Sequence, residues 1–478
     1  MKSHGVARAA IAAGLSASAV VAQACPKVLV PSYNLPAVHP GWQAQLVAGG
    51  LTKPRSIEFD TAGNLVVVES GKGVVLHRFK DNGGTCLEQT ETTLLIPQTS
   101  LNHGLAFSLD GKTLYASTAE AVFAWDYDAT RGTVGATPRT IVTGMANDDL
   151  VTRTLLIPRT GGGGKLLVSR GSADANILRA ETLTSGLSQI RAFDLSNLTT
   201  SSKPYDFSTQ GLVLGWGLRN TVGLAAHPAT GGLYGVENSV DGVTRNGRDI
   251  HENNPGEELN FFGYLDTTKP SPSQGRNFGY PHCFAVWDVS EIPDNDGLSV
   301  GDQFARTENS TLRDETCAAD YVPPRLTFPA HYAPLDIKFS ADGAEAYVSF
   351  HGSFDKTDPV GYSVASVRFD ASTGEPMASR EAAHDALTEI MSNPDHAKCP
   401  GQCFRPAGLA VDGRGRVWMT SDTTGEVFVM EKKAGGATAT VSGGLVTAPT
   451  GKSAAARWGV GVWGVVLAVA VGFVGGMV

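Results

Sequence analysis

A short pattern of apolar and polar positions recurs along this chain. Each copy has an alternating strand, a turn of the Asp-x-x-Gly type, and a second strand that ends in small or polar residues. In the three clearest copies the turn glycine follows the first residue by eight positions: Gly63 after Arg55, Gly111 after His103 and Gly413 after Arg405. Looser copies begin at Arg153 and Arg219, and a sixth has Leu335 in first place. Alternation around a glycine turn predicts a β-hairpin in every copy.

The spacing of these hairpins predicts the fold. Six strand–turn–strand units, mostly 48 to 70 residues apart, are typical of a closed radial array of sheets. We therefore expect an all-β fold, a six-bladed β-propeller. One longer interval, from about residue 244 to residue 329, is rich in Asn, Pro and Gly and contains Cys283 and Cys317. We expect it to be a loop insertion that covers one face of the propeller and is held together by a disulfide. Residues 379–391 have a helical pattern.

The first residues of the copies suggest a binding site. In a propeller the innermost strands line the axis, so equivalent first residues should converge on one central mouth. Five of them carry a cationic or imidazole side chain, namely Arg55, His103, Arg153, Arg219 and Arg405. Together they predict a cationic mouth suited to an anionic ligand.

The N-terminus has the features of a secretory signal peptide. Lys2 and Arg8 supply the positive region, residues 9–21 are apolar, and residues 22–24 form a small-x-small cleavage site. We expect residues 1–24 to be removed, which leaves Cys25 at the start of the mature chain. A bacterial lipoprotein signal also ends before a cysteine, but Gln23 fits that signal poorly.

The C-terminus carries a second apolar segment, residues 458–478, which contains no charged residue. A transmembrane anchor normally has a basic cytoplasmic flank, and this segment has none. Small residues from Ser442 to Gly444, a spacer up to Arg457 and the apolar tail match a glycosylphosphatidylinositol (GPI) signal. We expect attachment at Ser442, because the competing residues 453–455 leave too short a spacer. A transmembrane helix, or neither kind of anchor, stays open as an alternative.

These signals divide the chain into four parts. We expect a signal peptide over residues 1–24, one propeller domain over residues 25–434, a flexible stalk with the GPI attachment region over residues 435–457, and the apolar GPI signal over residues 458–478. The formal net charge of −9 argues against binding to nucleic acid. The cationic first residues therefore stand against an acidic background, which favours a local anion site. We expect a monomer.

The six cysteines of a secreted chain predict three disulfides. Many pairings are possible, and proximity along the chain favours Cys25–Cys86, Cys283–Cys317 and Cys399–Cys403. No Cys-x-x-Cys pair lies beside a histidine at zinc-ligand spacing, so sulfur ligation of a metal is not expected. Asn197 and Asn309 each begin an Asn-x-Thr sequence and are expected glycosylation sites on surface loops.

Several sequence blocks resemble a known family. Leu218-Arg219-Asn220, Glu237-Asn238-Ser239, the stretch 257–260 and the stretch 277–281 resemble the soluble quinoprotein sugar dehydrogenases. More closely, the mature chain resembles the fungal pyrroloquinoline quinone (PQQ)-dependent pyranose dehydrogenase and sorbosone dehydrogenase group. Further blocks follow in the family's order at residues 101–104, 152–155, 333–336, 350–353, 361–362 and 403–406. The resemblance implies a six-bladed propeller, in agreement with the repeat count.

The resemblance also implies two cofactors. PQQ is a planar ortho-quinone with three carboxylates, so it needs several cations around it. The residues that would hold it are Arg55, Arg219, Arg405 and, as a weaker candidate, Lys356, while Asn220 would hydrogen-bond the quinone or the metal shell. A calcium ion would polarise the quinone carbonyls. Its ligands would be largely backbone carbonyls near Ser239 and Val240, and such ligands leave little trace in a sequence.

The implied reaction is oxidation of a sugar hydroxyl by hydride transfer to the quinone, with a histidine as general base. In the resembling proteins this histidine opens the third blade, in a His-x-Thr-Arg-Thr stretch. This chain has Leu150 at that place, ahead of Thr152-Arg153-Thr154, and leucine cannot accept a proton. We expect His103, Asp148 or Asp149 to substitute, with Arg153 in the same catalytic site. Impaired activity stays open as well.

Two further functions remain alternatives. One is a non-catalytic surface propeller that binds a glycan or PQQ, which the loss of the histidine would explain. The other is a calcium lactonase, which needs a carboxylate-rich axis unlike the cationic mouth expected here. For the dehydrogenase we expect a sugar substrate and a separate electron acceptor, a cytochrome or a copper oxygenase. We expect the protein at the outer face of the plasma membrane or in the cell wall.

Overall fold

The structure is a computed structural model that describes residues 25–433 except 174–176, 197, 200 and 201. The predicted signal peptide, the acceptor Asn197, the stalk, Ser442 and the apolar C-terminal segment lie outside the described residues. Within the part that is described, no helix is both long and apolar enough to cross a membrane.

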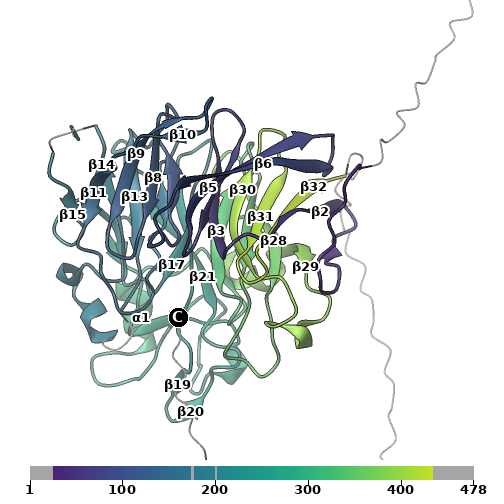
Figure 1. Cartoon of the computed structure of the whole chain (residues 1–478). Coiled ribbons are helices and arrows are strands. Elements are labelled where there is room, and N and C mark those ends of the chain that lie inside the picture. The colour runs from purple at the N-terminus through teal and green to yellow at the C-terminus, as the bar shows by residue number, and fades with distance from the viewer. Residues whose placement is uncertain (1–24, 174–176, 197, 200–201, 434–478) are drawn as a thin grey trace, which may run out of the picture. The chain divides into compact units, whose positions relative to one another are not determined.

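Six sheets of four or more strands follow one another along the chain and form the six blades of a propeller (Figure 1). Blade 1 contains β3 (Pro54–Phe59), β4 (Leu65–Glu69), β5 (Gly73–Asp81) and β6 (Leu87–Ile96). Blade 2 contains β7 (Leu105–Phe107), β8 (Thr113–Ser117), β9 (Val122–Asp128) and β11 (Arg139–Thr143), with β10 (Thr133–Val134) and β15 (Tyr205–Asp206) at its outer side. Blade 3 contains β12 (Leu155–Leu156), β13 (Lys165–Arg170), β14 (Gln189–Asp194) and β16 (Leu212–Trp216), joined by β22 (Arg276–Asn277). The six sheets are antiparallel except where β15 and β22 join blades 2 and 3.

The second half of the ring has the same construction. Blade 4 contains β17 (Thr221–Ala226), β18 (Leu233–Glu237), β21 (Glu257–Gly263) and β25 (Leu326–Phe328). Blade 5 contains β26 (Pro334–Phe339), β27 (Glu345–Phe350), β28 (Ser363–Arg368) and β29 (Leu387–Ser392), with β1 (Ala37–Val38) at its edge. Blade 6 contains β30 (Pro406–Val411), β31 (Val417–Ser421), β32 (Glu426–Lys432) and β2 (Trp42–Gly49).

The ring is closed by the N-terminal strand. β2 pairs antiparallel with β32, so the outermost strand of the last blade comes from the start of the chain. This pairing joins the two ends of the propeller and covers an edge that would otherwise expose unpaired backbone groups. The predicted all-β, six-bladed propeller is confirmed.

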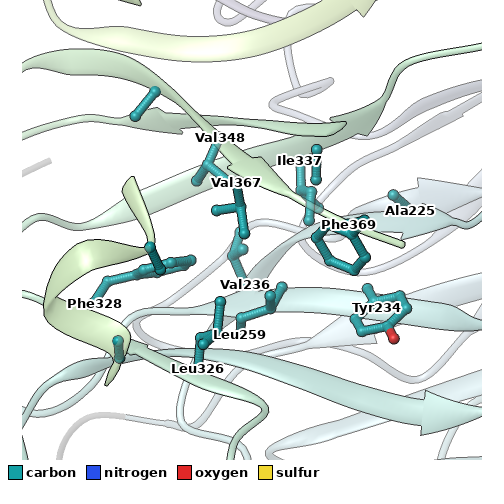
Figure 2. Close-up of a cluster of buried hydrophobic side chains, with 14 of the residues drawn as sticks. Ala225, Tyr234, Val236, Leu259, Leu326, Phe328, Ile337, Val348, Val367 and Phe369 are labelled. Atoms are coloured by element: carbon teal, nitrogen blue, oxygen red, sulfur yellow. The ribbon is translucent and has the colours of Figure 1, made fainter. Parts of the chain in front are cut away.

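The core lies between adjacent blades. Figure 2 shows the largest cluster, in which Val236 and Leu259 of blade 4 pack with Ile337 and Val348 of blade 5. Burying an aliphatic side chain of this kind contributes roughly 1.5–3 kcal/mol. Because neighbouring blades cover both faces, inner strands such as β4, β18 and β31 are buried along their whole length.

Hydroxyl groups connect three pairs of adjacent blades near the axis. Ser117 of β8 donates to the carbonyl of Arg153 at 2.7 Å, Ser349 of β27 to that of Ala407 at 2.6 Å, and Thr420 of β31 to that of Arg55 at 2.8 Å. In these three places the small polar residues near the end of the second strand of a blade hold the innermost strand of the next blade.

The register of the sixth repeat differs from the prediction. The turn glycine of blade 6 is Gly415, which has a φ of +80° and donates its N–H to the Asp412 carbonyl at 2.9 Å. Gly413 does not occupy this left-handed position. Eight residues before Gly415 stands Ala407, so Ala407 and not Arg405 is the equivalent of Arg55.

The structure differs from the sequence prediction in one loop insertion and in one helix. The expected insertion is two segments, because β21 passes through it as the third strand of blade 4. Its added elements are β19 (Thr244–Arg245), β20 (Arg248–Asp249), β23 (Cys283–Ala285), η3 (Val289–Glu291), β24 (Gln303–Ala305) and α1 (Asp314–Asp320). The helix expected at residues 379–391 is wrong: a short 3-10 helix, η4 (Arg380–Asp385), precedes β29, whose pairing with β28 overrides the local pattern. Three further 3-10 segments are η1 (Ile177–Glu181), η2 (Leu183–Ser185) and η5 (His396–Lys398).

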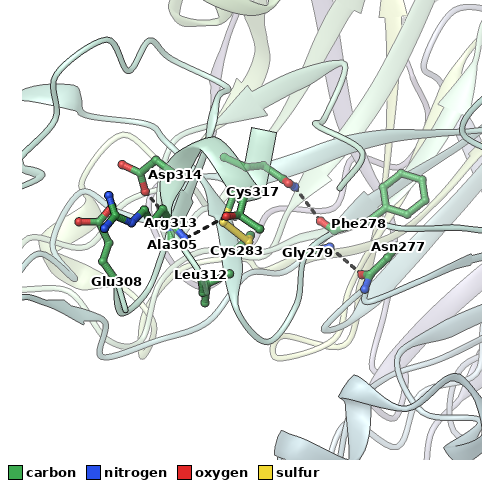
Figure 3. The surroundings of a disulfide bond; sticks show 12 residues. Asn277, Phe278, Gly279, Cys283, Ala305, Glu308, Leu312, Arg313, Asp314 and Cys317 are labelled. Atoms are coloured by element: carbon green, nitrogen blue, oxygen red, sulfur yellow. Dashed lines mark hydrogen bonds between the residues drawn. A yellow bond between two sulfur atoms is a disulfide. The ribbon is translucent and has the colours of Figure 1, made fainter. Parts of the chain in front are cut away.

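The predicted disulfides are confirmed: Cys25–Cys86, Cys283–Cys317 and Cys399–Cys403. The second one joins β23 to α1 inside the insertion (Figure 3). Close to it, Asp314 accepts a hydrogen bond from the Ala305 N–H at 2.8 Å and pairs with the fully buried Arg245. Asn309 lies exposed in the same insertion, and its glycosylation stays a prediction.

Candidate functional site

Six equivalent residues at the start of the innermost strands form a ring around the axis. They are Arg55, His103, Arg153, Val222, Leu335 and Ala407. The last three are buried and pack against one another. Half of the ring is therefore apolar, and the expectation of an almost fully cationic ring is wrong. We call the end of the axis at which these strands begin the mouth.

Arg219 and Arg405 belong to the loops that lead into the strands. Arg219 precedes β17 by two positions, and Arg405 directly precedes β30. Both side chains are only partly buried. The cationic groups of the mouth thus come from two levels, with Arg55 in the ring and the other two arginines in the loops above it.

Arg153 does not reach the mouth. Its side chain is completely buried, and its guanidinium donates to the carbonyls of Leu150 at 2.8 Å, Thr152 at 2.6 Å and Met145 at 2.7 Å. Burial lowers the pKa of Arg153 to about 9. Arg153 therefore holds the loop from Met145 to Thr152 in place. The prediction that it belongs to the catalytic site is wrong, because its side chain is buried.

A three-residue network crosses the mouth between blades 1, 5 and 6. Asp422, which follows β31, accepts from Arg55 Nη1 at 2.5 Å and lies 2.9 Å from His351 Nε2. Burial opposes the ionisation of Asp422, but His351 and Arg55 outweigh it and hold the pKa of Asp422 well below its usual range. Asp422 is therefore a carboxylate that orients one imidazole and one guanidinium.

His351 has the chemistry of a base. Burial lowers its pKa, and the attraction of Asp422 offsets only part of that shift. Its side chain is 18% exposed. When Nε2 carries the proton that Asp422 accepts, Nδ1 keeps a free lone pair, and no described residue donates to it. A neutral imidazole held by a carboxylate is a common arrangement for general-base catalysis.

His103 is less suited to that role. Its Nδ1 accepts a hydrogen bond from Arg55 Nε at 3.3 Å, and the Val222 carbonyl also contacts the ring. Burial, and after it the charges of Arg55 and Lys338, hold the pKa of His103 well below its ordinary value. With both ring nitrogens engaged and the side chain buried, His103 positions Arg55.

Arg405 holds the loop that carries His351. Its Nε donates to the His351 carbonyl at 3.0 Å, its Nη2 donates to the Gly352 carbonyl at 2.9 Å, and its guanidinium lies over the Tyr362 ring. Lys356, farther along the same loop, is engaged elsewhere: its ammonium group donates to the Glu252 carbonyl and to Asn253 Oδ1. Lys356 thus joins this loop to the insertion.

Arg219 holds the loop that was predicted to bind calcium. Its Nη1 donates to the Ser239 carbonyl at 2.5 Å and its Nη2 to Asp241 at 3.1 Å. The Ser239 N–H donates in turn to Glu257 at 2.7 Å. The Val240 carbonyl accepts no hydrogen bond among the described residues, so it is available as a ligand. The described residues contain no group of three or more His, Cys, Asp or Glu side chains that could hold a metal ion.

Three carboxylates lie buried beneath this loop, namely Glu237, Glu257 and Glu258. Asn260 donates to Glu237 at 3.2 Å and to Glu258 at 2.8 Å. Burial raises the pKa of Glu258 to about 7. Burial and the nearby charge of Glu258 together hold the pKa of Glu237 well above its usual range. The sequence blocks at 237–239 and 257–260 therefore meet around one loop.

Leu150 lies in a strained backbone position, with a φ of +47°. Leu150 packs against Gly171, as Asn220 does. A Cβ added to Gly171 would lie 2.9 Å from the Leu150 Cβ and 2.9 Å from Asn220 Oδ1, so these three residues meet beside blade 3. Asp149 precedes it on an exposed loop and has no hydrogen-bond partner among the described residues. The structure thus brings Leu150 and Asn220 together and leaves Asp149 at the surface.

The mouth suits a ligand with several carboxylates. A guanidinium has five N–H donors, and each mouth arginine uses only two of its nitrogens. Nη2 of Arg55, Nε of Arg219 and Nη1 of Arg405 have no partner among the described residues. Guanidinium groups bind carboxylates in planar, often bidentate pairs. The sequence did not indicate Asp422, which looks like an ordinary turn residue after a strand. It also gave no sign that His351 could act as a base.

Two similar proteins have names that refer to a quinone cofactor with several carboxylates. A pyrroloquinoline quinone-dependent sugar dehydrogenase of Hypocrea jecorina (strain QM6a) is 47% identical over 406 residues, which cover 84% of this chain and 91% of that protein. A pyrroloquinoline quinone-dependent pyranose dehydrogenase of Coprinopsis cinerea is 38% identical over 427 residues, which cover 86% of this chain and 56% of that protein.

Solved structures show the same fold. The calcium structure of the Trichoderma reesei member of Carbohydrate-Active Enzymes family AA12 matches with a TM-score of 0.82 and 47% identity, over 85% of this chain and 100% of that one. The holo form of the pyranose dehydrogenase PQQ domain from Coprinopsis cinerea matches with a TM-score of 0.78 and 36% identity, over 85% and 99% of the two chains. The family model described as TrAA12-like matches residues 36–433, and the chain therefore belongs to the TrAA12-like family, as its resemblance to the fungal PQQ-dependent dehydrogenases implied.

Proposed function

We propose that this protein is a PQQ- and calcium-dependent dehydrogenase that oxidises a pyranose-type sugar. The observation that carries the proposal is the network of Arg55, Asp422 and His351, which puts an oriented base beside cationic groups at one mouth. The relatives named as PQQ-dependent sugar and pyranose dehydrogenases support it.

Arg55, Arg219 and Arg405 would hold PQQ through their unengaged nitrogens, and Asn220 lies next to Arg219 as a further donor. Lys356 is a weaker candidate because Glu252 and Asn253 already engage its ammonium group. When bound, PQQ supplies a quinone that accepts a hydride from the sugar carbon. Calcium would bind near the Ser239 and Val240 carbonyls and polarise the quinone.

The protein's own groups handle the proton. His351 Nδ1 takes the proton of the sugar hydroxyl while its Nε2–H stays bonded to Asp422, and the resulting imidazolium is stabilised by that carboxylate. Arg55 neutralises the other oxygen of Asp422 and keeps the carboxylate from rotating. This assignment replaces the base that Leu150 cannot supply, and it ranks His351 above His103 and Asp149.

The cellular setting is part of the proposal. A cleaved signal peptide, glycosylation at Asn197 and Asn309, and a GPI anchor at Ser442 would put the enzyme on the outer face of the plasma membrane or in the cell wall. Electrons would leave to a separate acceptor protein, a cytochrome or a copper oxygenase, and we propose that the enzyme acts as a monomer.

The direct test is a titration of metal-free, purified protein with PQQ in the presence and absence of calcium. A panel of sugars with a dye acceptor then follows on the loaded protein. We expect PQQ to bind, calcium to tighten binding, and one or more pyranoses to be oxidised. PQQ binding without oxidation of any sugar would support the non-catalytic alternative, and failure to bind PQQ contradicts the proposal.

A further inference from the structure

A cavity of about 420 Å³ lies at the end of the axis opposite to the mouth. All six innermost strands line it, together with the first residues of the turns that follow them. No residue of the ring at the mouth lines it, so the ring separates the two ends of the axis. Its volume lies in the usual range of small-molecule sites, roughly 300–1,000 Å³. We call it the lower axial cavity.

Glu58 of β3 lines this cavity and has no partner among the described residues. Glu58 is itself only partly buried, whereas every buried carboxylate in the described chain accepts at least one hydrogen bond, namely Asp60, Glu69, Glu237, Glu257, Glu258, Asp336 and Glu426. Burial raises the pKa of Glu58, although Lys338 and Arg159 partly oppose that shift. A carboxylate that faces a cavity and that no hydrogen bond from the protein satisfies is available to a ligand.

The nearest cation inside the cavity is already paired. Lys338 Nζ lies 2.7 Å from Asp336 Oδ1, and Asp336 Oδ2 accepts from the Leu409 N–H at 2.8 Å. This pair is neutral as a whole, so an ionised Glu58 makes the interior of the cavity negative. The complementary ligand group is therefore a cation.

The surroundings favour an organic cation over a metal ion. Among the described residues no three His, Cys, Asp or Glu side chains converge as metal ligands. The lining mixes polar and apolar side chains, with Leu105, Leu156 and Phe339 among the apolar ones. An ammonium group needs only one counter-ion, and an apolar stem behind it would contact these walls. Arg159 lies exposed at the rim without a hydrogen bond or ion pair to a described residue, so a carboxylate could approach it.

We propose that the lower axial cavity binds a small ammonium compound. Its charged head pairs with Glu58, its apolar stem lies along the wall, and a carboxylate at its far end, where present, pairs with Arg159. The site is separate from the mouth and takes no part in sugar oxidation.

The test is titration calorimetry on the full purified chain with three probes: n-butylamine, 6-aminohexanoate and hexanoate. We expect both amines to bind, with 6-aminohexanoate the tighter, and hexanoate not to bind. Glu58→Gln keeps the shape of the side chain but removes the charge. It should weaken both amines by about 10- to 100-fold, the range of a lost hydrogen bond to a charged group. Arg159→Gln should weaken 6-aminohexanoate alone.

Controls separate the site from general effects. Glu315→Gln, an exposed change of the same type in α1, should leave binding unchanged. Ala106→Leu, which fills the cavity without altering its charge, should abolish binding even if Glu58→Gln does not fold. The proposal is overturned if neither amine binds at millimolar concentration, if hexanoate binds as well as the amines, or if the Glu58 variant binds them like the wild type.

Discussion

Asp422 holds His351 and Arg55 at the same time, with its two oxygens 2.9 Å from His351 Nε2 and 2.5 Å from Arg55 Nη1. The three residues come from blades 5, 6 and 1, so the closure of the propeller brings them together. One carboxylate therefore couples the orientation of the proposed base to that of a proposed cofactor-binding cation.

Replacing Asp422 should affect catalysis and its pH dependence together. Because burial lowers the pKa of His351, its neutral form predominates at neutral pH, and kcat/KM should rise with pH only in the acid range and then stay flat. Asp422→Asn removes the charge that raises this pKa. The acid limb should move to lower pH while kcat falls by on the order of 10²–10⁴-fold. A pH–rate profile measures both, and an unshifted limb would contradict the assignment.

The loop arginines should contribute to cofactor affinity. Arg219→Ala and Arg405→Ala should each weaken PQQ binding by about 1.5–3 kcal/mol, the contribution of a hydrogen bond to a charged group. Arg414→Ala is the matched control, since Arg414 is exposed in the turn after β30, away from the mouth. Titration of the three variants with PQQ makes the comparison. Equal affinity for all of them and the wild type means that PQQ lies elsewhere.

Leu150 should tolerate a histidine without a gain of activity. Since His351 already supplies a base, Leu150→His should change kcat by less than about tenfold. Steady-state kinetics with the best sugar of the panel gives the answer. An increase of about 10²-fold or more would show instead that the wild type lacks its base and that His351 serves another purpose.

Arg153 should matter for stability. Arg153→Met removes three buried hydrogen bonds from a charged group, each typically worth about 1.5–3 kcal/mol, so the free energy of unfolding should fall by at least about 3 kcal/mol. Arg131→Met, at an exposed site on blade 2, should leave it nearly unchanged. Denaturant titration of both variants is the measurement, and equal stability of the two would contradict the anchoring role.

The buried carboxylates of blade 4 should make stability depend on pH. Burial raises the pKa of Glu258 from 4.5 to about 7, so the folded state binds a proton more tightly than the unfolded chain. That contribution is present below about pH 4.5 and is lost as the pH rises through about 7. Glu258→Gln should flatten this part of the stability curve of the metal-free protein. An unchanged slope in denaturant titrations at several pH values speaks against it.

The sequence was sufficient for the fold and for part of the site. Turn glycines at a regular spacing between apolar strand segments predicted the blades, because each hairpin needs a left-handed residue at its turn. The register of blade 6 went wrong since Gly413 and Gly415 both suit a turn, and only the hydrogen bond to Asp412 selects between them. The burial of Arg153 depends on where a loop folds back, which local pattern does not encode. The pairing of Asp422 with His351 joins residues of adjacent blades that are 71 apart in sequence, and the contact of Asp422 with Arg55 depends on ring closure, so no local pattern encodes either.

The most direct test of the account is His351→Gln in a single-turnover experiment with PQQ-loaded protein and a pyranose, alongside His39→Gln at an exposed site as control. The account predicts that both variants bind PQQ like the wild type, that the His39 variant reduces the cofactor at the wild-type rate, and that the His351 variant does so roughly 10²–10⁴-fold more slowly. A His351 variant that binds PQQ and turns over at the wild-type rate would contradict it.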